Sequence, residues 1–488
     1  MLFNSFEFIF LFLPITFFAY FWLNHKRLTE AAKAFLVVAS LFFYSWWNIK
    51  YLPLILVSMV FNFAIGSALS AGKSRVSPRA LLAFGIIANV ALLGYFKYAD
   101  FFIANANFVF GSHVEPLKLL LPLAISFFTF QQIAYLVDSY RSETKEYDFL
   151  SYALFVTFFP QLIAGPIVHH KEMMPQFATL RAKVKNYRNI LLGIFIFSMG
   201  LFKKVAIADT FAQYATQGFD VAKTLEFFAA WQTSLAYTFQ LYFDFSGYCD
   251  MAIGAALLFN IKLPINFNSP YRSTNIAEFW RRWHITLGRF LRDYVYIPLG
   301  GSRAGEGRTY LNLLATLLLS GLWHGAGWTF VFWGFLHGVA ICICKFWSQI
   351  GLKLPKIIAW FITFNFINAS WVFFRANSFD DALKVLRGMI GLNGANWGGF
   401  IKAKTAILVD LNQWLDLSNS NIDKTLLIIK FPVFTAFAFI LTIFFKNSLE
   451  FAPGKANAAW TLYFAVLFLI SIFLTSVGTY TEFIYFNF

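Results

Sequence analysis

His324 is an ionisable residue in the middle of a long apolar run. The run LLLSGLWHGAGWTFVFWGFLHGVAICIC (317–344) holds two histidines but no acidic residue, lysine or arginine. Burying an ionisable side chain at membrane depth is costly, and by default such a residue is a candidate functional site. A neutral imidazole can take a proton from a hydroxyl group near pH 7. We therefore predict that His324 is a catalytic general base.

The second histidine of this run is His337. On one continuous helix the two histidines would lie about 220° apart and could not act as a pair. His324 would then share a face with Ser320, Trp328 and Gly338. The five glycines of the run would let neighbours approach closely or let the helix break. We expect His337 to be a structural histidine bonded to a carbonyl group.

The segment EFWRRWHITLGRFLRDYVYIPLGGSR (278–303) concentrates positive charge in this apolar chain. On a helical wheel, residues 278–294 divide into an aromatic face and an opposite, charged face. His284 and Gly288 lie between two arginines on a stripe at the edge, where Gly288 would leave space beside the imidazole. This pattern predicts one amphipathic helix that lies in the membrane interface.

The arginines of this segment have two interpretations. They could anchor the helix on lipid phosphates, or they could bind the phosphates of a polar substrate. The continuation IPLGGSRAGEGR (297–308) is not a P-loop, but it could offer backbone N–H groups and arginines to a phosphate. The candidate substrate-binding residues are Arg281, Arg282, Arg289, Arg292 and Arg303, with Arg308 in the same loop.

Other residues with chemical potential carry weaker signals. His169 and His170, next to Glu172, are a weak metal candidate and are better explained as part of a basic cytosolic loop, so we predict no metal site. Asp244 could orient a histidine or be a buried structural carboxylate. The three cysteines lack zinc-site spacing and are expected to be packing residues. No GxSxG, HExxH or His-x4-Asp motif is present.

The chain that must position these residues is very apolar. Of its 488 residues, 59% are hydrophobic and 13% are charged, and the mean hydropathy is +0.62. We predict an all-α, polytopic integral membrane protein with about 11 transmembrane helices plus re-entrant and interfacial helices, as a single domain over 1–488. The pieces at 100–111, 150–165 and 247–262 are expected to be re-entrant or broken. The predicted spans are 4–23, 34–48, 51–70, 80–97, 117–140, 189–215, 226–246, 309–320, 321–347, 355–374, 425–445 and 457–477.

The net charge of +15 is explained by membrane topology rather than by nucleic acid. The basic linkers 72–79, 166–190 and 272–308 are predicted to face the cytosol. The first span is predicted to have its N-terminus outside and its basic end inside, without a cleavable signal. The more polar residues 378–424 are predicted to form a surface helix, a loop and a short helix.

Seven stretches resemble the membrane-bound O-acyltransferases, in the order that the family has them. The resemblance is closest to the bacterial branch that contains the membrane subunit of alginate and peptidoglycan O-acetylation, and more distant to the teichoic-acid D-alanyl transfer proteins. One departure is the pair His169-His170 after AGPIV, where the family pattern leads us to expect an arginine. The stretches are LPLAISFFTFQQIAYLVDSYR (121–141), FPQLIAGPIVHHKEMMPQF (159–177), QLYFDFSGYCDMAIG (240–254), FWRRWHITLGRFLRDYVYIPLGGSR (279–303), LWHGAGWTFVFWGFLHG (322–338), FNFINASWVFFRANSFDDAL (364–383) and FIYFNF (483–488).

The resemblance implies a helical body in which a cytosolic and an extracytoplasmic funnel meet at a thin centre. It implies that His324 is the catalytic histidine and His284 the second signature histidine. It further implies a bacterial cytoplasmic (inner) membrane location, acetyl-CoA as a cytosolic donor substrate, no permanently bound cofactor, and a separate extracytoplasmic, SGNH-like acetyltransferase as partner.

On this hypothesis the arginines bind the phosphates of acetyl-CoA, and His324 acts as general base on an acceptor hydroxyl or as a transient acyl carrier. His284 positions or polarises the thioester. The expected contacts are acetyl-CoA, the partner protein and membrane lipid, with no nucleic acid. Three alternatives stay open: D-alanyl transfer to teichoic acid from a carrier protein, a lipid or acyl transporter without chemistry, and an assembly subunit. The absence of a visible internal repeat speaks against a transporter.

Overall fold

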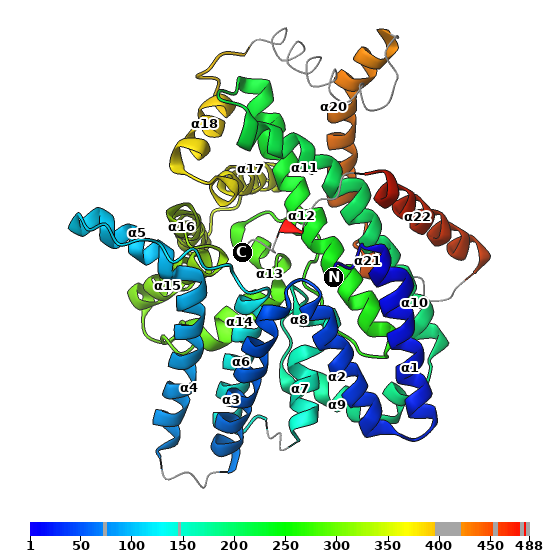
Figure 1. Cartoon of the computed structure of the whole chain (residues 1–488). Coiled ribbons are helices and arrows are strands. Elements are labelled where there is room, and N and C mark those ends of the chain that lie inside the picture. Colours follow the sequence, from blue (N-terminus) through cyan, green and yellow to red (C-terminus); the bar gives the residue numbers. More distant parts are fainter. Residues whose placement is uncertain (72–75, 145–147, 396–420, 452–456, 479–482, 485–488) are drawn as a thin grey trace.

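The computed structural model describes residues 1–71, 76–144, 148–395, 421–451, 457–478 and 483–484, and for residues 421–430 it gives the backbone alone. Within these ranges every regular element is a helix, which confirms the all-α prediction (Figure 1). The α-helices are α1 (Leu13–His25), α2 (Thr29–Ser45), α3 (Leu52–Ala71), α4 (Pro78–Leu93), α5 (Ala99–Phe110), α6 (Ile125–Tyr140), α7 (Phe149–Thr157), α8 (Phe159–Leu162), α9 (His170–Ala178), α10 (Tyr187–Phe202), α11 (Asp209–Thr216), α12 (Phe227–Leu258), α13 (Ile276–Arg282), α14 (Ile285–Leu291), α15 (Glu306–His324), α16 (Trp328–Ile350), α17 (Lys356–Arg375), α18 (Phe379–Met389), α20 (Asn421–Phe444), α21 (Ser448–Phe451) and α22 (Ala458–Val477).

Short π and 3-10 turns extend or join these helices. They are η1 (Glu7–Phe12), η2 (Ile49–Tyr51), η3 (Gly94–Tyr98), η4 (Leu180–Lys183), η5 (Lys203–Ala208), η6 (Gln217–Val221), η7 (Pro270–Arg272) and η8 (Arg292–Tyr296).

Seven helical stretches in the described part of the chain are long and apolar enough to cross a membrane. The protein is therefore a multi-pass membrane protein, as predicted, although the predicted count of about 11 crossings is not confirmed. Several other predicted spans correspond to shorter helices, such as α2 with 17 residues and α6 with 16. The seven stretches are Glu7–His25, Ile49–Ala71, Pro78–Phe110, Tyr187–Val221, Trp328–Ile350, Lys356–Arg375 and Ala458–Val477.

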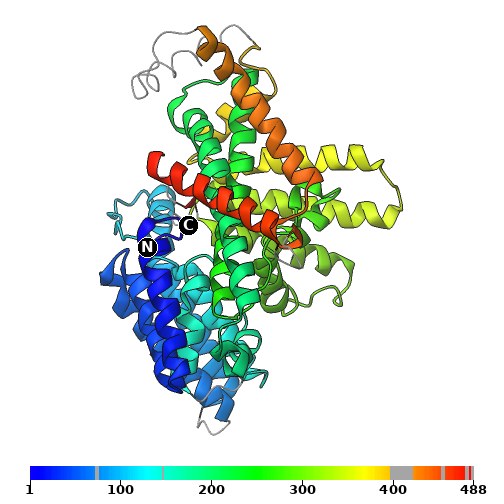
Figure 2. The ribbon, with the colours of Figure 1, turned by 90° about the vertical axis from the view of Figure 1, so that its right-hand side faces the viewer.

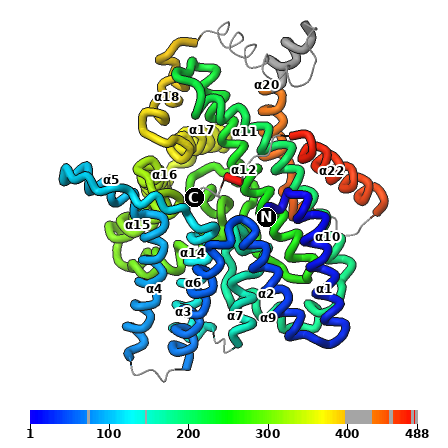
Figure 3. Tube along the Cα trace, viewed as in Figure 1, coloured from blue at the N-terminus to red at the C-terminus, as the bar shows by residue number. Residues whose placement is uncertain are grey.

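The helices form two groups around the long helix α12. Helices α1 to α4, α6 and α7 stand side by side at one end of the molecule (Figure 3). Helices α16 and α17 are neighbouring rods that extend to one side (Figure 2). The predicted surface helix within 378–424 is α18, whereas residues 396–420 of that region lie outside the described residues.

Helix α12 corrects the prediction that 247–262 is a separate, broken piece. It is one continuous helix of 32 residues, buried over most of its length. Glycines seven residues apart on α10 and α12 face each other in antiparallel register, because a Cβ on Gly193 would lie 2.7 Å from the carbonyl oxygen of Gly254 and one on Gly200 would lie 2.5 Å from that of Gly247. These glycines allow close packing of two membrane helices and do not break either one.

Two successive lysines of η5 bond to α12 inside the protein. Lys203 Nζ lies 2.7 Å from Asp250 Oδ2, and Lys204 Nζ lies 2.7 Å from Asp244 Oδ1 and 2.8 Å from Asp209 Oδ1. The contacts of Asp244 are therefore those of a buried structural carboxylate, one of the two roles considered for it.

The predicted breaks elsewhere are present. Helices α7 and α8 divide the piece predicted at 150–165, and α5 leaves α4 at an angle after the π-turn η3 (Figure 1). Insertion of a π-turn into a helix is a known cause of such bends. The loop Gly325–Gly327 separates α15 from α16, which double back on each other, and a Cβ on Gly334 would lie 2.4 Å from the carbonyl oxygen of Leu317.

Candidate active site

His324 is the last residue of α15, and its side chain is buried. Aromatic rings surround the imidazole, with ring centroids 4.7 Å away at Trp323, 5.2 Å at Trp333 and 5.0 Å at Phe374. Because the helix ends here, the expected continuous face with Ser320, Trp328 and Gly338 does not exist. His324 instead occupies a helix terminus beside a glycine-rich turn.

His284 lies between two short helices, and this corrects the prediction of one amphipathic helix over 278–294. Helix α13 ends at Arg282, α14 begins at Ile285, and His284 between them has a left-handed backbone with φ +44°. The loop residue Asn266 explains the break, since its carbonyl oxygen accepts the N–H of Ile285 at 3.0 Å and its side-chain oxygen accepts that of Thr286 at 3.2 Å. These bonds replace those that a continuous helix would make.

The aromatic face of this segment packs against protein. Trp283 is buried, and its ring centroid lies 5.0 Å from those of Phe267 and Trp371. The one atom that a Cβ on Gly288 would meet within 4 Å is the carbonyl oxygen of Trp280, at 3.6 Å, and not the imidazole of His284. The predicted stripe of His284 and Gly288 between two arginines is wrong, because it needs the continuous helix that breaks at His284.

The fold brings His284 and His324 together from positions forty residues apart in the sequence. Their ring centroids are 6.5 Å apart, and both side chains are buried. Phe245 of α12 lies against His284 with a centroid distance of 4.9 Å, and Trp323 lies 6.1 Å from the same ring. Two imidazoles in an aromatic enclosure are the feature of this protein best suited to proton transfer.

His337 has structural contacts on both ring nitrogens. The indole Nε1–H of Trp280 donates to Nδ1 at 3.2 Å, so the neutral ring carries its proton on Nε2, which lies 2.9 Å from Ser370 Oγ. A structural role was expected, but the partners are an indole and a hydroxyl group rather than a carbonyl group.

Lys97 and Tyr98 were missed by the sequence analysis. Lys97 Nζ donates to the carbonyl oxygen of Trp323, contacts that of His324 at 3.5 Å, and lies 3.2 Å from Ser126 Oγ. The hydroxyl group of Tyr98 donates to the carbonyl oxygen of Leu322 at 2.6 Å. The last carbonyls of a helix have no partner within it, so these two side chains cap the turn that holds His324. The signal was a single lysine in the apolar run 80–97.

A cavity of about 620 Å³ opens beside this turn. Its lining includes the loop Gly325–Gly327, Lys97, Gln240 and Arg375. Phe374 also lines the cavity and contacts the ring of His324, so the cavity reaches the immediate surroundings of His324.

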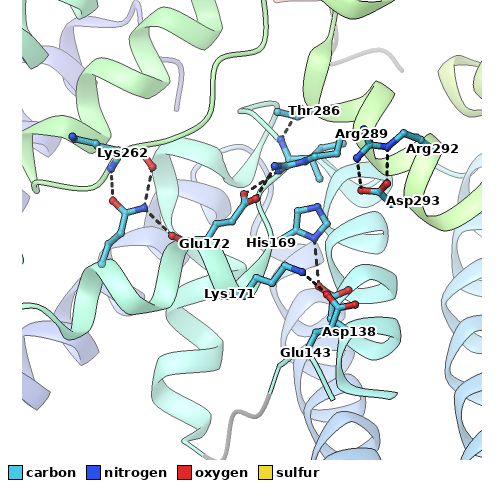
Figure 4. A network of polar contacts seen from close by, with 12 residues as sticks. Asp138, Glu143, His169, Lys171, Glu172, Lys262, Thr286, Arg289, Arg292 and Asp293 are labelled. Atoms are coloured by element: carbon cyan, nitrogen blue, oxygen red, sulfur yellow. Dashed lines mark hydrogen bonds and ion pairs between the residues drawn. The ribbon is translucent and has the colours of Figure 1, made fainter. Parts of the chain in front are cut away.

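Three of the predicted arginines pair with carboxylates. Arg289 makes two bonds to Glu172, at 2.6 and 3.0 Å, and Arg292 pairs with Asp293 at 2.7 Å (Figure 4). Arg282 pairs with Glu278 at 3.0 Å. The exposed members of the predicted set and its loop are Arg281, Arg292, Arg303 and Arg308, and of these only Arg292 pairs with a carboxylate among the described residues.

His169 belongs to a buried polar cluster rather than to a solvated loop. Its Nδ1 lies 3.0 Å from the hydroxyl oxygen of Tyr294, which donates to Asp138 Oδ1 at 2.7 Å. The other carboxylate oxygen of Asp138 lies 3.4 Å from His169 Nδ1 (Figure 4). Among the residues that the structure describes, no three His, Cys, Asp or Glu side chains come together as a metal site would require.

The chain is thus a polytopic helical protein with two neighbouring buried histidines in its interior, near a cavity. The sequence matches the model of the membrane-bound O-acyltransferase family, MBOAT, over residues 7–379. The chain belongs to this family and is an acyltransferase.

Relatives cover the whole chain. It is 49% identical to a peptidoglycan O-acetyltransferase of Helicobacter pylori, over all of this chain and 98% of that protein. It is 40% identical to the probable alginate O-acetylase AlgI of Pseudomonas aeruginosa, over 84% of this chain and 80% of that protein. A teichoic acid D-alanyltransferase of Streptococcus thermophilus is more distant, at 28% identity over 53% of this chain and 69% of that protein.

Proposed function

We propose that this protein transfers an acetyl group from cytosolic acetyl-CoA across the bacterial cytoplasmic membrane for the O-acetylation of an extracytoplasmic polysaccharide, alginate-like or peptidoglycan. The observation that carries the proposal is the pair His284 and His324, buried with ring centroids 6.5 Å apart beside a cavity. The two relatives whose names describe O-acetylation support acetyl as the acyl group that is transferred.

The basic linkers give the proposal an orientation. With 72–79 on the cytosolic side by the positive-inside rule, α4 starts there at Pro78. Lys97 follows 19 residues later, which corresponds to roughly 28 Å of helix, close to the hydrocarbon thickness of a bilayer. The cavity that Lys97 lines therefore belongs to the extracytoplasmic half, where the acceptor would enter.

The donor would bind on the opposite side. Ser126, in the first turn of α6, lies beside Lys97. Asp138 lies about 18 Å further along the same helix, towards the cytosolic end of the protein. Tyr294 and Arg289, which lie in the basic segment 278–303, join the polar groups at this end (Figure 4 shows the pair that Arg289 forms). We place the phosphates of acetyl-CoA near the exposed Arg281, Arg303 and Arg308, with the pantetheine arm leading to the histidines.

The transfer then needs one base and one proton donor. His324 takes the proton of the acceptor hydroxyl while the oxygen attacks the thioester carbonyl carbon. The new C–O bond forms, the C–S bond breaks, and the proton on His324 passes to the departing thiolate, which leaves as free CoA. The acceptor is either the polysaccharide itself or a hydroxyl group of a separate extracytoplasmic, SGNH-like transferase that completes the reaction.

The test is acetyl transfer by the purified protein in liposomes. Wild type is compared with His324→Ala and with His113→Ala, a control at an exposed histidine. Labelled acetyl-CoA is the donor, and alginate or peptidoglycan fragments with the partner transferase are the acceptor. We expect CoA release and acetyl transfer to fall at least a hundredfold in His324→Ala alone.

Two results would contradict the proposal. Undiminished, partner-dependent acetyl transfer by His324→Ala would exclude the catalytic assignment. Transfer of D-alanine from a charged carrier protein, with no use of acetyl-CoA, would favour the second candidate, which the more distant D-alanyltransferase relative supports. A transporter or an assembly subunit would show no thioester cleavage with either donor.

A further inference from the structure

The side chain of Asn266 contacts His284 at the break between α13 and α14. Asn266 is buried, and its Oδ1 receives three contacts: His284 Nδ1 at 3.2 Å, the Thr286 backbone N at 3.2 Å and Thr286 Oγ1 at 3.0 Å. Its Nδ2 lies 3.4 Å from Cys249 Sγ. Its backbone carbonyl also accepts the N–H of Ile285, so one asparagine fixes three consecutive residues.

These contacts determine which way round the amide group sits. A backbone N–H can only donate, so the atom that meets the Thr286 N–H must be the amide oxygen. The hydroxyl group of Thr286 accepts the backbone N–H of Ile167 at 3.0 Å, which leaves its own proton to donate to the same oxygen. The amide NH₂ then faces the sulfur of Cys249, a weak acceptor.

The orientation of the amide in turn determines the tautomer of His284. The amide oxygen of Asn266 can only accept a hydrogen bond. Nδ1 of His284, 3.2 Å from it, must therefore carry a proton. A neutral imidazole has one N–H, so Nε2 carries the lone pair. This is the opposite of His337, where the indole of Trp280 leaves the proton on Nε2.

We infer that Asn266 is a positioning residue that holds His284 in the Nδ1–H tautomer, so that Nε2 of His284 is a second acceptor, beside His324, for the one proton that the acceptor hydroxyl releases and that then passes to the departing thiolate. The inference rests on the proposed function and adds to it a role for His284. Polarising a thioester carbonyl group would require an N–H directed at its oxygen, and Nε2 in this tautomer has none.

The distance between the two rings is consistent with His284 accepting a proton from a group that lies between His284 and His324. With ring centroids 6.5 Å apart, the nearest ring nitrogens of His284 and His324 are at least about 4 Å apart, too far for a direct hydrogen bond. A single hydroxyl or thiol group that contacts both nitrogens would bridge this distance. Among the described residues around His284, the titratable groups are His324 and, behind Asn266, Cys249, while Phe245 and Trp323 are apolar.

The test compares Asn266→Asp, Asn266→Leu and the control Cys249→Ser, which keeps an acceptor for the other end of the amide. Each variant is assayed for acetyl transfer as a function of pH, and for the KM of acetyl-CoA. A carboxylate still accepts from Nδ1–H and Thr286 but stabilises the imidazolium form, whereas leucine removes the acceptor. We expect Asn266→Leu to lose kcat at least about a hundredfold with KM unchanged, the lower end of what a positioned general base contributes.

Asn266→Asp gives the decisive result, and it still tests the inference if the leucine variant does not fold. If His284 accepts a proton, stabilising its charged form moves the acid limb of the pH profile to higher pH, by about one unit or more, with kcat kept at alkaline pH. If His284 instead donates, the alkaline limb extends to higher pH and the inference is wrong. An unchanged profile, or full activity in Asn266→Leu, also overturns it.

Failure of the inference can be told apart from failure of the proposed function. If wild type uses a D-alanyl donor in place of acetyl-CoA, the proposed function fails, and the same three variants test the inference with that donor. If wild type transfers acetyl groups and Asn266→Asp shows no change of the acid limb, only the inference fails.

Discussion

The cap that Lys97 places on the end of α15 leads to a prediction about Lys97→Met. Methionine keeps the length and apolar body of the side chain but removes the ammonium group, so the carbonyl oxygens of Trp323 and His324 lose their donor. Tyr98 still caps Leu322. Hydrogen bonds from charged groups contribute about 1.5–3 kcal/mol each, and part of that gain is offset because methionine costs nothing to desolvate.

We take about 2 kcal/mol as the net loss for the last turn of α15. Because His324 is in that turn, the same energy would appear as a fall in the rate of acetyl transfer of about thirtyfold. The assay is CoA release in liposomes at saturating acetyl-CoA, with Lys97→Arg and Tyr98→Phe alongside. Arginine keeps the charge and should restore most of the rate, and the loss of the neutral Tyr98 bond should cost about 1 kcal/mol, or about fivefold.

The prediction is specific to the turn. Thermal unfolding of the whole protein should change little in Lys97→Met, because the lost bonds concern one turn of one helix. A folded Lys97→Met variant with kcat within twofold of wild type would refute the argument that this cap positions His324.

Three further predictions concern charge and packing. Arg281→Ala should raise the KM for acetyl-CoA several-fold with kcat unchanged, and the effect should shrink in high salt; an unchanged KM would remove this exposed arginine from the donor site. Arg289→Ala and Glu172→Gln should each lower the free energy of unfolding by about 1 kcal/mol. The double variant should lose less than the sum of the two, because each single change breaks the same half-exposed pair. Strictly additive losses in thermal unfolding would contradict this. Gly334→Ala should abolish folding or activity, because its Cβ would lie 2.4 Å from a backbone oxygen of α15, whereas the control Gly307→Ala has open space; a stable, active Gly334→Ala would show that α15 and α16 can separate.

The membrane class and the burial of His324 could be predicted because both depend on local composition. A histidine in a run without other charges signals a functional site wherever the run folds, and the same rule applied to Lys97 would have found the cap of α15. The carbonyl partners of that lysine, on Trp323 and His324, lie more than 200 positions away, so no local pattern could have named them.

The segment 278–294 shows where periodicity fails. Its amphipathic pattern favours one helix, but bonds from Asn266 to Ile285 and Thr286 compete with the helical bonds and break it at His284. The aromatic residues on the predicted face are buried, as the pattern indicated, but against other helices rather than lipid. The arginines were expected to act together because they share a segment. Arg289 instead pairs with Glu172 from a distant position, while Arg282 and Arg292 pair with carboxylates of the segment itself.

The buried pairs between η5 and α12 have a consequence for how the chain enters the bilayer during synthesis. Inserted alone, a helix with Lys203 and Lys204 and a helix with Asp244 and Asp250 would bring four charges into lipid at about 3 kcal/mol each. Paired, the charges shield each other, and the matched glycines of α10 and α12 let the backbones meet. The segment from α10 to α12 is thus suited to leave the insertion machinery as one hairpin, around which the other helices can assemble.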